Sequence, residues 1–181
     1  MPAVSSAFRQ AVKKLSDKEK EAIILKAARR DAELYDLLSY EILEEVTLEE
    51  VYEQSADKIH ELLIHATGRS LTKALAKALR KAIKEIARFK RITKDQKAEV
   101  DLHLYTLRLI FSNFTGQFDS YYKGFYTATA RLLLRTMQLI RKNLHEDYHL
   151  EYKSELDEFL EQMHSRKKPL PVTLPQEFEV E

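Results

Sequence analysis

The chain has 181 residues, of which 44% are hydrophobic and 33% are charged, and it contains 3 Gly, 4 Pro and no Cys. The length suits one domain or a domain with an appendage, and the hydrophobic fraction is sufficient for a core. The lack of Cys excludes disulfides, thiolate zinc sites, iron–sulfur clusters and cysteine nucleophiles. The scarcity of Gly and Pro argues against a sandwich or barrel.

The net charge of +1 hides a strong segregation of charge along the chain. Residues 1–30 carry 8 basic and 3 acidic side chains, residues 31–67 carry 1 and 11, and residues 68–98 carry 11 and 2. Residues 99–142 carry 6 and 3, and residues 143–181 carry 4 and 10. Such segments either pair with one another or are presented to partners.

The sequence shows no signal for secretion or for membrane insertion. The N-terminal run MPAVSSAFRQAVKKL lacks the sustained apolar stretch of a signal peptide. No run of about 18 apolar residues predicts a spanning helix. We therefore expect a soluble cytoplasmic protein with no membrane contact and no cofactor.

The first 43 residues are predicted to form three short helices. Apolar spacing predicts a helix over residues 5–15, and Ser16 with Glu19 forms a capping-box pattern that starts a second helix at residue 17. Asp31 can cap a third helix that ends near residue 43. Four apolar positions of this third helix are expected to face inward: Leu34, Leu37, Leu38 and Ile42.

A helical hairpin is predicted to follow. Thr47 with Glu50 forms a second capping box, and the helix over residues 48–67 carries five acids against one Lys. The next helix, over residues 71–92, carries eight Lys and Arg against Glu85. Because the link between them is short, we expect an antiparallel hairpin in which the acidic helix lies beside the basic one.

The remaining sequence predicts three more helices, over residues 94–114, 118–143 and 145–165. The Pro-rich residues 166–181 are expected to form an extended or disordered tail. The predicted fold is therefore all-α, either an antiparallel helical bundle or a short α-hairpin array of seven to eight helices. One domain is expected over residues 1–165.

The basic helix carries a stripe of cations. At about 100° per residue, six of its Lys and Arg side chains fall in one sector roughly 80° wide. The stripe could lie along a nucleic-acid backbone, because its span of about 27 Å would reach several phosphates. Alternatively, the acidic helix neutralises part of it and water solvates the rest. The six cations are Lys73, Lys77, Arg80, Lys84, Arg88 and Arg91.

Aromatic residues are concentrated in the region that follows. Eight of the seventeen aromatics lie between Tyr105 and Tyr126. Their helical spacing is typical of core packing, and the alternative is an exposed cleft near Gly116 in which rings stack on a ligand. The candidate cleft residues are Phe118, Tyr121 and Tyr122.

His145-Glu146-Asp147-Tyr148-His149 matches the H-E-x-x-H pattern. On a helix, His145 and His149 would share a face and could bind zinc, with Glu146 as general base. Asp147 and Tyr148 are polar where such a buried helix is usually apolar, and no third ligand stands out. The motif is therefore a weak candidate for a metal site and for a metal-dependent hydrolase.

The order of features from residue 70 onward resembles uncharacterised bacterial all-helical proteins, in which a basic helix precedes an aromatic-rich hairpin. The matching runs are KALRKAIKEIARFKRITKD, then DLHLYTLRLIFSNFTGQFDSYYKGFY, then LIRKNL. The resemblance covers about 75 residues (70–145) and is one of layout. It implies a helical architecture and no particular activity.

Taken together, these patterns predict a non-enzymatic helical binding or scaffold protein that acts through charged helix surfaces. We expect a protein partner or self-association. The alternative is a nucleic-acid binder that uses the stripe of the basic helix. A hydrolase at His145 and His149 is the alternative of another class.

Overall fold

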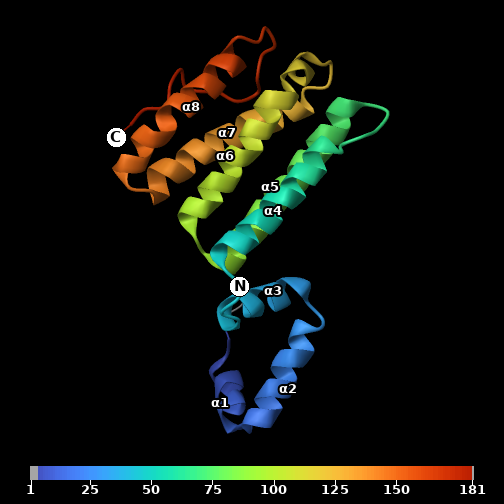
Figure 1. Cartoon of the computed structure of the whole chain (residues 1–181), viewed down its shortest axis with the longest axis vertical. Coiled ribbons are helices and arrows are strands. Elements are labelled where there is room, and N and C mark those ends of the chain that lie inside the picture. Colours follow the sequence, from blue (N-terminus) through green and yellow to red (C-terminus); the bar gives the residue numbers. More distant parts are fainter. Residues whose placement is uncertain (1–3, 181) are drawn as a thin grey trace. The chain divides into compact units, whose positions relative to one another are not determined.

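A computed structural model describes residues 4–180 and shows eight α-helices and one short 3-10 helix in that range (Figure 1). The predicted all-α fold of seven to eight helices is confirmed, and no strand occurs among the described residues. No helix within them is both long enough and apolar enough to cross a bilayer. The helices are α1 (Ser6–Lys14), α2 (Asp17–Ala28), α3 (Ala32–Ile42), α4 (Leu48–Ile64), α5 (Leu71–Thr93), α6 (Gln96–Asn113), η1 (Thr115–Asp119), α7 (Gly124–Asn143) and α8 (Glu146–His164).

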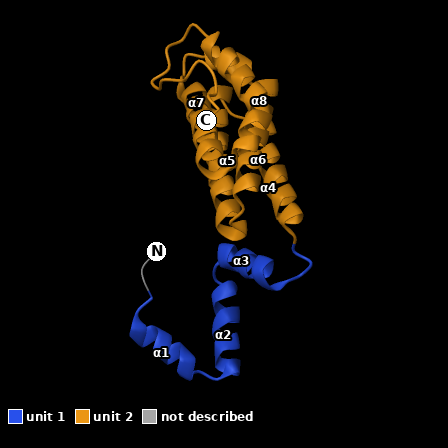
Figure 2. Cartoon of the chain, turned by 90° about the vertical axis from the view of Figure 1, so that its left-hand side faces the viewer, with its two compact units in different colours: residues 1–46 blue, residues 47–181 orange. Residues whose placement is uncertain are grey.

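The chain divides into two compact units, residues 1–46 and residues 47–181, which Figure 2 colours separately. This differs from the single domain predicted over residues 1–165. The first unit has no buried side chain among its described residues, so the apolar positions predicted to face inward there do not form a core. Amphipathic spacing alone could not reveal which apolar faces find a partner.

Unit 1 contains α1, α2 and α3, of which α2 and α3 pack against each other. The predicted caps are confirmed, because Ser16 and Glu19 form both bonds of a capping box and Asp31 accepts from two backbone N–H groups of α3. The predicted inward positions of α3 are at most half-buried, and Ile42 is 65% exposed. The local signals in this unit therefore define helices without defining a core.

Unit 2 contains α4 to α8, which run alongside one another (Figure 1). α5 packs against α4, α6 and α7. The predicted α4–α5 hairpin is confirmed, and Thr47 with Glu50 forms the expected capping box. The apolar back of α5 is fully buried: Leu75, Leu79, Ala82, Ile86 and Phe89.

Two helix starts in unit 2 differ from those predicted. Asp95 caps α6 by accepting from the N–H of Ala98, so the helix predicted over residues 94–114 begins at Gln96. The helix predicted over residues 118–143 begins only at Gly124, because residues 115–119 form a separate 3-10 turn. The exposed segment between these two elements carries the tyrosines of the candidate cleft.

The C-terminal tail has no helix or strand among its described residues. Phe178 is nevertheless fully buried, and its backbone N–H donates to Asp157 at 2.6 Å while its carbonyl accepts from Lys153 Nζ at 2.7 Å. Leu174 is also buried. Both hydrogen bonds involve a charged side chain of α8, and they hold the extended tail against this helix.

Candidate nucleic-acid interface

The front of α5 carries the predicted basic stripe, which we define as Lys73, Lys77, Arg80, Lys84, Arg88 and Arg91. Five of these side chains are exposed, and Arg88 is half-buried. Arg88 Nη1 donates to Glu85 Oε1 at 2.6 Å, so it is engaged inside the helix pair. The stripe therefore combines five exposed cations with Arg88, which is held by Glu85.

Glu85 is the acid around which the α4–α5 contact is built. It is 5% exposed, and its carboxylate forms ion pairs with Lys58 of α4 and with Arg88. The hydroxyl of Ser55 donates to it at 3.4 Å. A buried carboxylate requires such partners, because an uncompensated charge away from water is costly. The Lys58–Glu85 ion pair therefore joins the acidic helix α4 to the basic helix α5.

Direct ion pairing is one way in which the acids of α4 could neutralise part of the stripe. Among the described residues, Glu53 and Asp57 form no ion pair, and neither do Lys77, Arg80 and Lys84. The cationic front of α5 is therefore left to solvent or to an anionic partner. Ion pairs at short range would cancel the charge of the stripe most strongly, because salt largely screens surface charges that lie farther apart.

α7 packs against α5 and carries no acid, because residues 124–143 contain four Lys and Arg and no Asp or Glu. Gly124 approaches α5 so closely that an added Cβ would lie 4.0 Å from Ala76 Cβ. At 100° per residue, Arg131 and Arg135 fall within about 20° of Gly124 around α7. Both side chains are exposed, and at 100° per residue they fall on the side of α7 opposite its buried Leu133.

A cleft of about 320 Å³ lies between the end of α4 and the start of α5. Lys77 and Lys81 line it from α5, and Glu61 and His65 line it from α4. Lys81 is exposed and had not been assigned to the stripe, because it falls about 40° beyond Lys77 around the helix. Lys81 therefore extends the cationic surface of α5 toward the end of α4.

The three candidate cleft aromatics occupy different environments. Phe118 is fully buried, so its assignment to an exposed cleft was wrong. Its ring packs 5.2 Å from that of Tyr126, centroid to centroid. Tyr121 is 89% exposed and Tyr122 is 45% exposed, with their rings 5.6 Å apart. Lys73 Nζ lies 4.0 Å from the centroid of Tyr122, which is the geometry of a cation–π contact and connects the tyrosines to the stripe.

The remaining aromatics of this region mostly form the core, as their spacing predicted. Phe111 stacks on Phe159 of α8 with ring centroids 4.4 Å apart. The hydroxyl of buried Tyr126 donates to the carbonyl of Met163 at 2.9 Å. These contacts join α6, α7 and α8, and they leave the Tyr121–Tyr122 pair as the exposed part of the cluster.

The H-E-x-x-H residues are used at a helix junction. His145 is the N-cap of α8, where its Nδ1 accepts from the N–H of Asp147, and it is exposed. His149 is buried, and its Nε2 lies 3.1 Å from the carbonyl of Ile140 and 3.2 Å from that of Leu144. Residues 4–180 contain no group of three His, Cys, Asp or Glu side chains arranged to hold a metal. His149 serves the last carbonyls of α7.

Buried His103 lies beneath the α7 edge of this surface. Burial and the nearby Arg135 guanidinium lower the pKa of His103 to about 4. Its Nδ1 lies 3.4 Å from the Thr136 hydroxyl. Because the imidazole is neutral at pH 7, it adds no charge to the interface, and the cations there come from Lys and Arg side chains.

Sequence reasoning did not single out the contribution of α7. Arg131 and Arg135 are remote from the stripe in the chain, and they belong to a helix that packs against α5. The signal that could have found them is the complete lack of acids between residues 124 and 143. No family model, curated protein or solved structure matches the chain.

Proposed function

We propose that the protein is a non-enzymatic nucleic-acid-binding protein whose stripe contacts the phosphate backbone of a single strand. The observation that carries this proposal is the exposure of Lys77, Arg80 and Lys84 without ion-pair partners among the described residues. Cations spaced along one helix face can each contact a phosphate and release a counterion. The span from Lys73 to Arg91 is about 27 Å at the α-helical rise.

The Tyr121–Tyr122 pair favours a single strand over a duplex. An exposed ring beside a cationic groove can stack on an unpaired base, which a duplex keeps within its own stack. Tyr121 is free to do so, since it is 89% exposed, and Tyr122 is held next to Lys73. The basic stripe would then position the strand, and stacking would add affinity with little sequence preference.

The salt dependence of binding to a fluorescein-labelled single-stranded oligonucleotide tests the proposal. With four phosphate contacts, affinity should fall roughly 50-fold between 50 and 200 mM salt. Tyr121→Ala should weaken binding by at least several-fold through lost stacking while leaving the slope unchanged. A flat salt dependence would refute the proposal. Equal affinity for poly-glutamate would assign the stripe to acidic proteins instead.

A further inference from the structure

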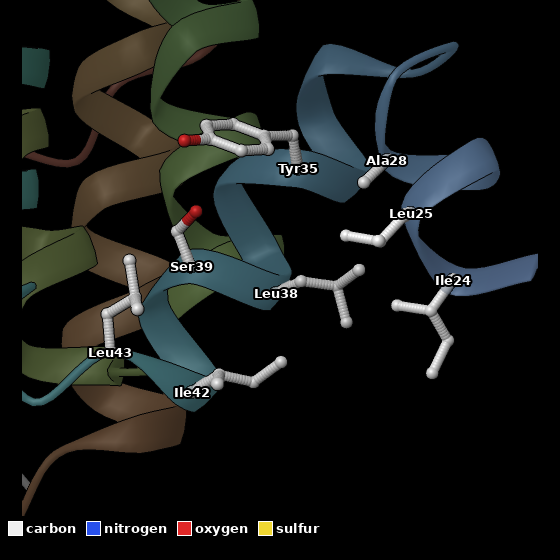
Figure 3. A pocket seen from close by; sticks show the side chains of 8 residues that line it. All are labelled: Ile24, Leu25, Ala28, Tyr35, Leu38, Ser39, Ile42 and Leu43. Atoms are coloured by element: carbon white, nitrogen blue, oxygen red, sulfur yellow. The ribbon is translucent and has the colours of Figure 1, made fainter. Parts of the chain in front are cut away.

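Unit 1 contains an apolar groove between α2 and α3, with a volume of about 210 Å³ (Figure 3). Among the eight residues that line it, Tyr35 and Ser39 supply the polar side-chain atoms, and the other six are aliphatic. In Figure 3, Leu38 lies between Ile42 of α3 and Leu25 of α2. An open apolar groove of this kind is a place where another apolar side chain can be buried.

α1 has the complementary feature, an apolar face that its own chain leaves uncovered. Phe8 is 61% exposed and Val12 is 37% exposed, and none of the residues of α1 is buried. The groove-lining residues all come from α2 and α3, so α1 does not cover the groove of its own chain. A nine-residue helix in water is marginal unless packing stabilises it.

The charges of these two surfaces are also complementary. α1 carries Arg9, Lys13 and Lys14 and no acid. Residues 31–46 carry six acids and no Lys or Arg. Glu44 and Glu45 are exposed immediately after Leu43, which lines the groove. A basic amphipathic helix and an acid-rimmed apolar groove are matched in both polarity and charge.

We propose that two copies of the chain associate by reciprocal exchange of α1, with Phe8 of each copy inserted in the α2–α3 groove of the other. The exchange is isologous, because each copy supplies one helix and one groove, and it therefore closes as a dimer. Burying Phe8 and its neighbours on both copies removes apolar surface that unit 1 otherwise exposes to water. The inference is independent of nucleic-acid binding, since it uses no residue of the stripe.

Sedimentation of the full chain tests this exchange. The wild-type chain should dimerise at micromolar concentration. Phe8→Asp and Ile42→Asp should each weaken the dimer roughly tenfold or more, and added salt should weaken it further. Leu150→Asp is the matched control, because Leu150 is an apolar residue of unit 2 that is 68% exposed. A monomeric wild-type chain, or a dimer that survives both unit 1 variants, would overturn the proposal.

Cross-linking identifies the occupant of the groove, because the chain has no native cysteine. A Phe8→Cys chain and an Ile42→Cys chain of different mass are mixed and oxidised, and the proposal expects the mixed disulfide as the main product. Leu150→Cys mixed with Ile42→Cys is the control. Equal yields from both mixtures would contradict the exchange. So would a double variant, Phe8→Cys with Ile42→Cys, that closes within one chain in excess wild-type protein.

Discussion

The two units of the molecule differ in whether their apolar side chains are buried or exposed. In unit 2, α5 buries Leu79 and Phe89 completely and turns most of its cations to solvent. In unit 1, Phe8 and Ile42 are both more than half exposed, and no described side chain is buried. Unit 2 therefore has a core of its own, and the surface that we propose for binding is charged. The surface that unit 1 offers is apolar.

The largest expected difference between the units is the loss of stability when a phenylalanine ring is removed. Phe118→Ala should lower the free energy of unfolding by about 3–5 kcal/mol, because it leaves a cavity among Phe111, Phe125 and Tyr126. Phe8→Ala should change the stability of the monomer by less than about 0.5 kcal/mol. Chemical denaturation of both variants at concentrations below dimerisation measures the contrast. Similar losses for the two variants would show that unit 1 has a core of its own.

The interior of unit 2 should also make its stability depend on pH. The pKa of His103 is lowered from 6.5 to about 4 by burial and by Arg135, so the unfolded chain binds a proton that the folded chain does not. Stability is therefore retained above pH 6.5 and lost as the pH falls toward 4, by on the order of 3 kcal/mol.

His103→Leu removes the titration of this histidine alone, because the Thr136 hydroxyl keeps its hydrogen bond to the Leu132 carbonyl. The difference in unfolding free energy between this variant and the wild type should change steadily between pH 6.5 and 4 and remain constant above. Denaturation curves at several pH values provide the comparison. A constant difference throughout that range would show that His103 is not buried in its neutral form.

A smaller effect is expected at the contact between α4 and α5. Glu85→Gln removes the charge that binds Lys58 and Arg88, and it should cost about 1–3 kcal/mol, limited by the partial exposure of both partners. Glu53→Gln, an exposed substitution on the neighbouring helix, should stay within about 0.5 kcal/mol. If the two variants lose the same stability, the central role of Glu85 in this helix pair is wrong.

The elements of the fold were largely predictable from local signals. Ser16–Glu19, Asp31 and Thr47–Glu50 mark helix starts by the chemistry of their side chains, and all of them act as caps. Such signals need only neighbouring residues. The division into two units was not predictable in this way, because whether an amphipathic face is covered depends on packing between distant segments.

The candidate site was predictable in part for the same reason. The stripe follows from helical periodicity, which places Lys77, Arg80 and Lys84 together whatever surrounds them. The pairing of Glu85 with Lys58 and the burial of Phe118 both depend on tertiary contacts. Spacing alone had favoured core packing for the aromatics of this region, with a cleft at Phe118 as the alternative.

Charge reversal on the stripe tests the central claim most directly. Lys77→Glu with Lys84→Glu is compared with Lys18→Glu with Lys167→Glu, which changes net charge equally at exposed positions outside the stripe. Anisotropy of a labelled single-stranded oligonucleotide is measured at low salt. The account predicts that the stripe variant loses binding by roughly 100-fold or more and that the control falls only a few-fold. Equal affinities for the two variants would contradict it.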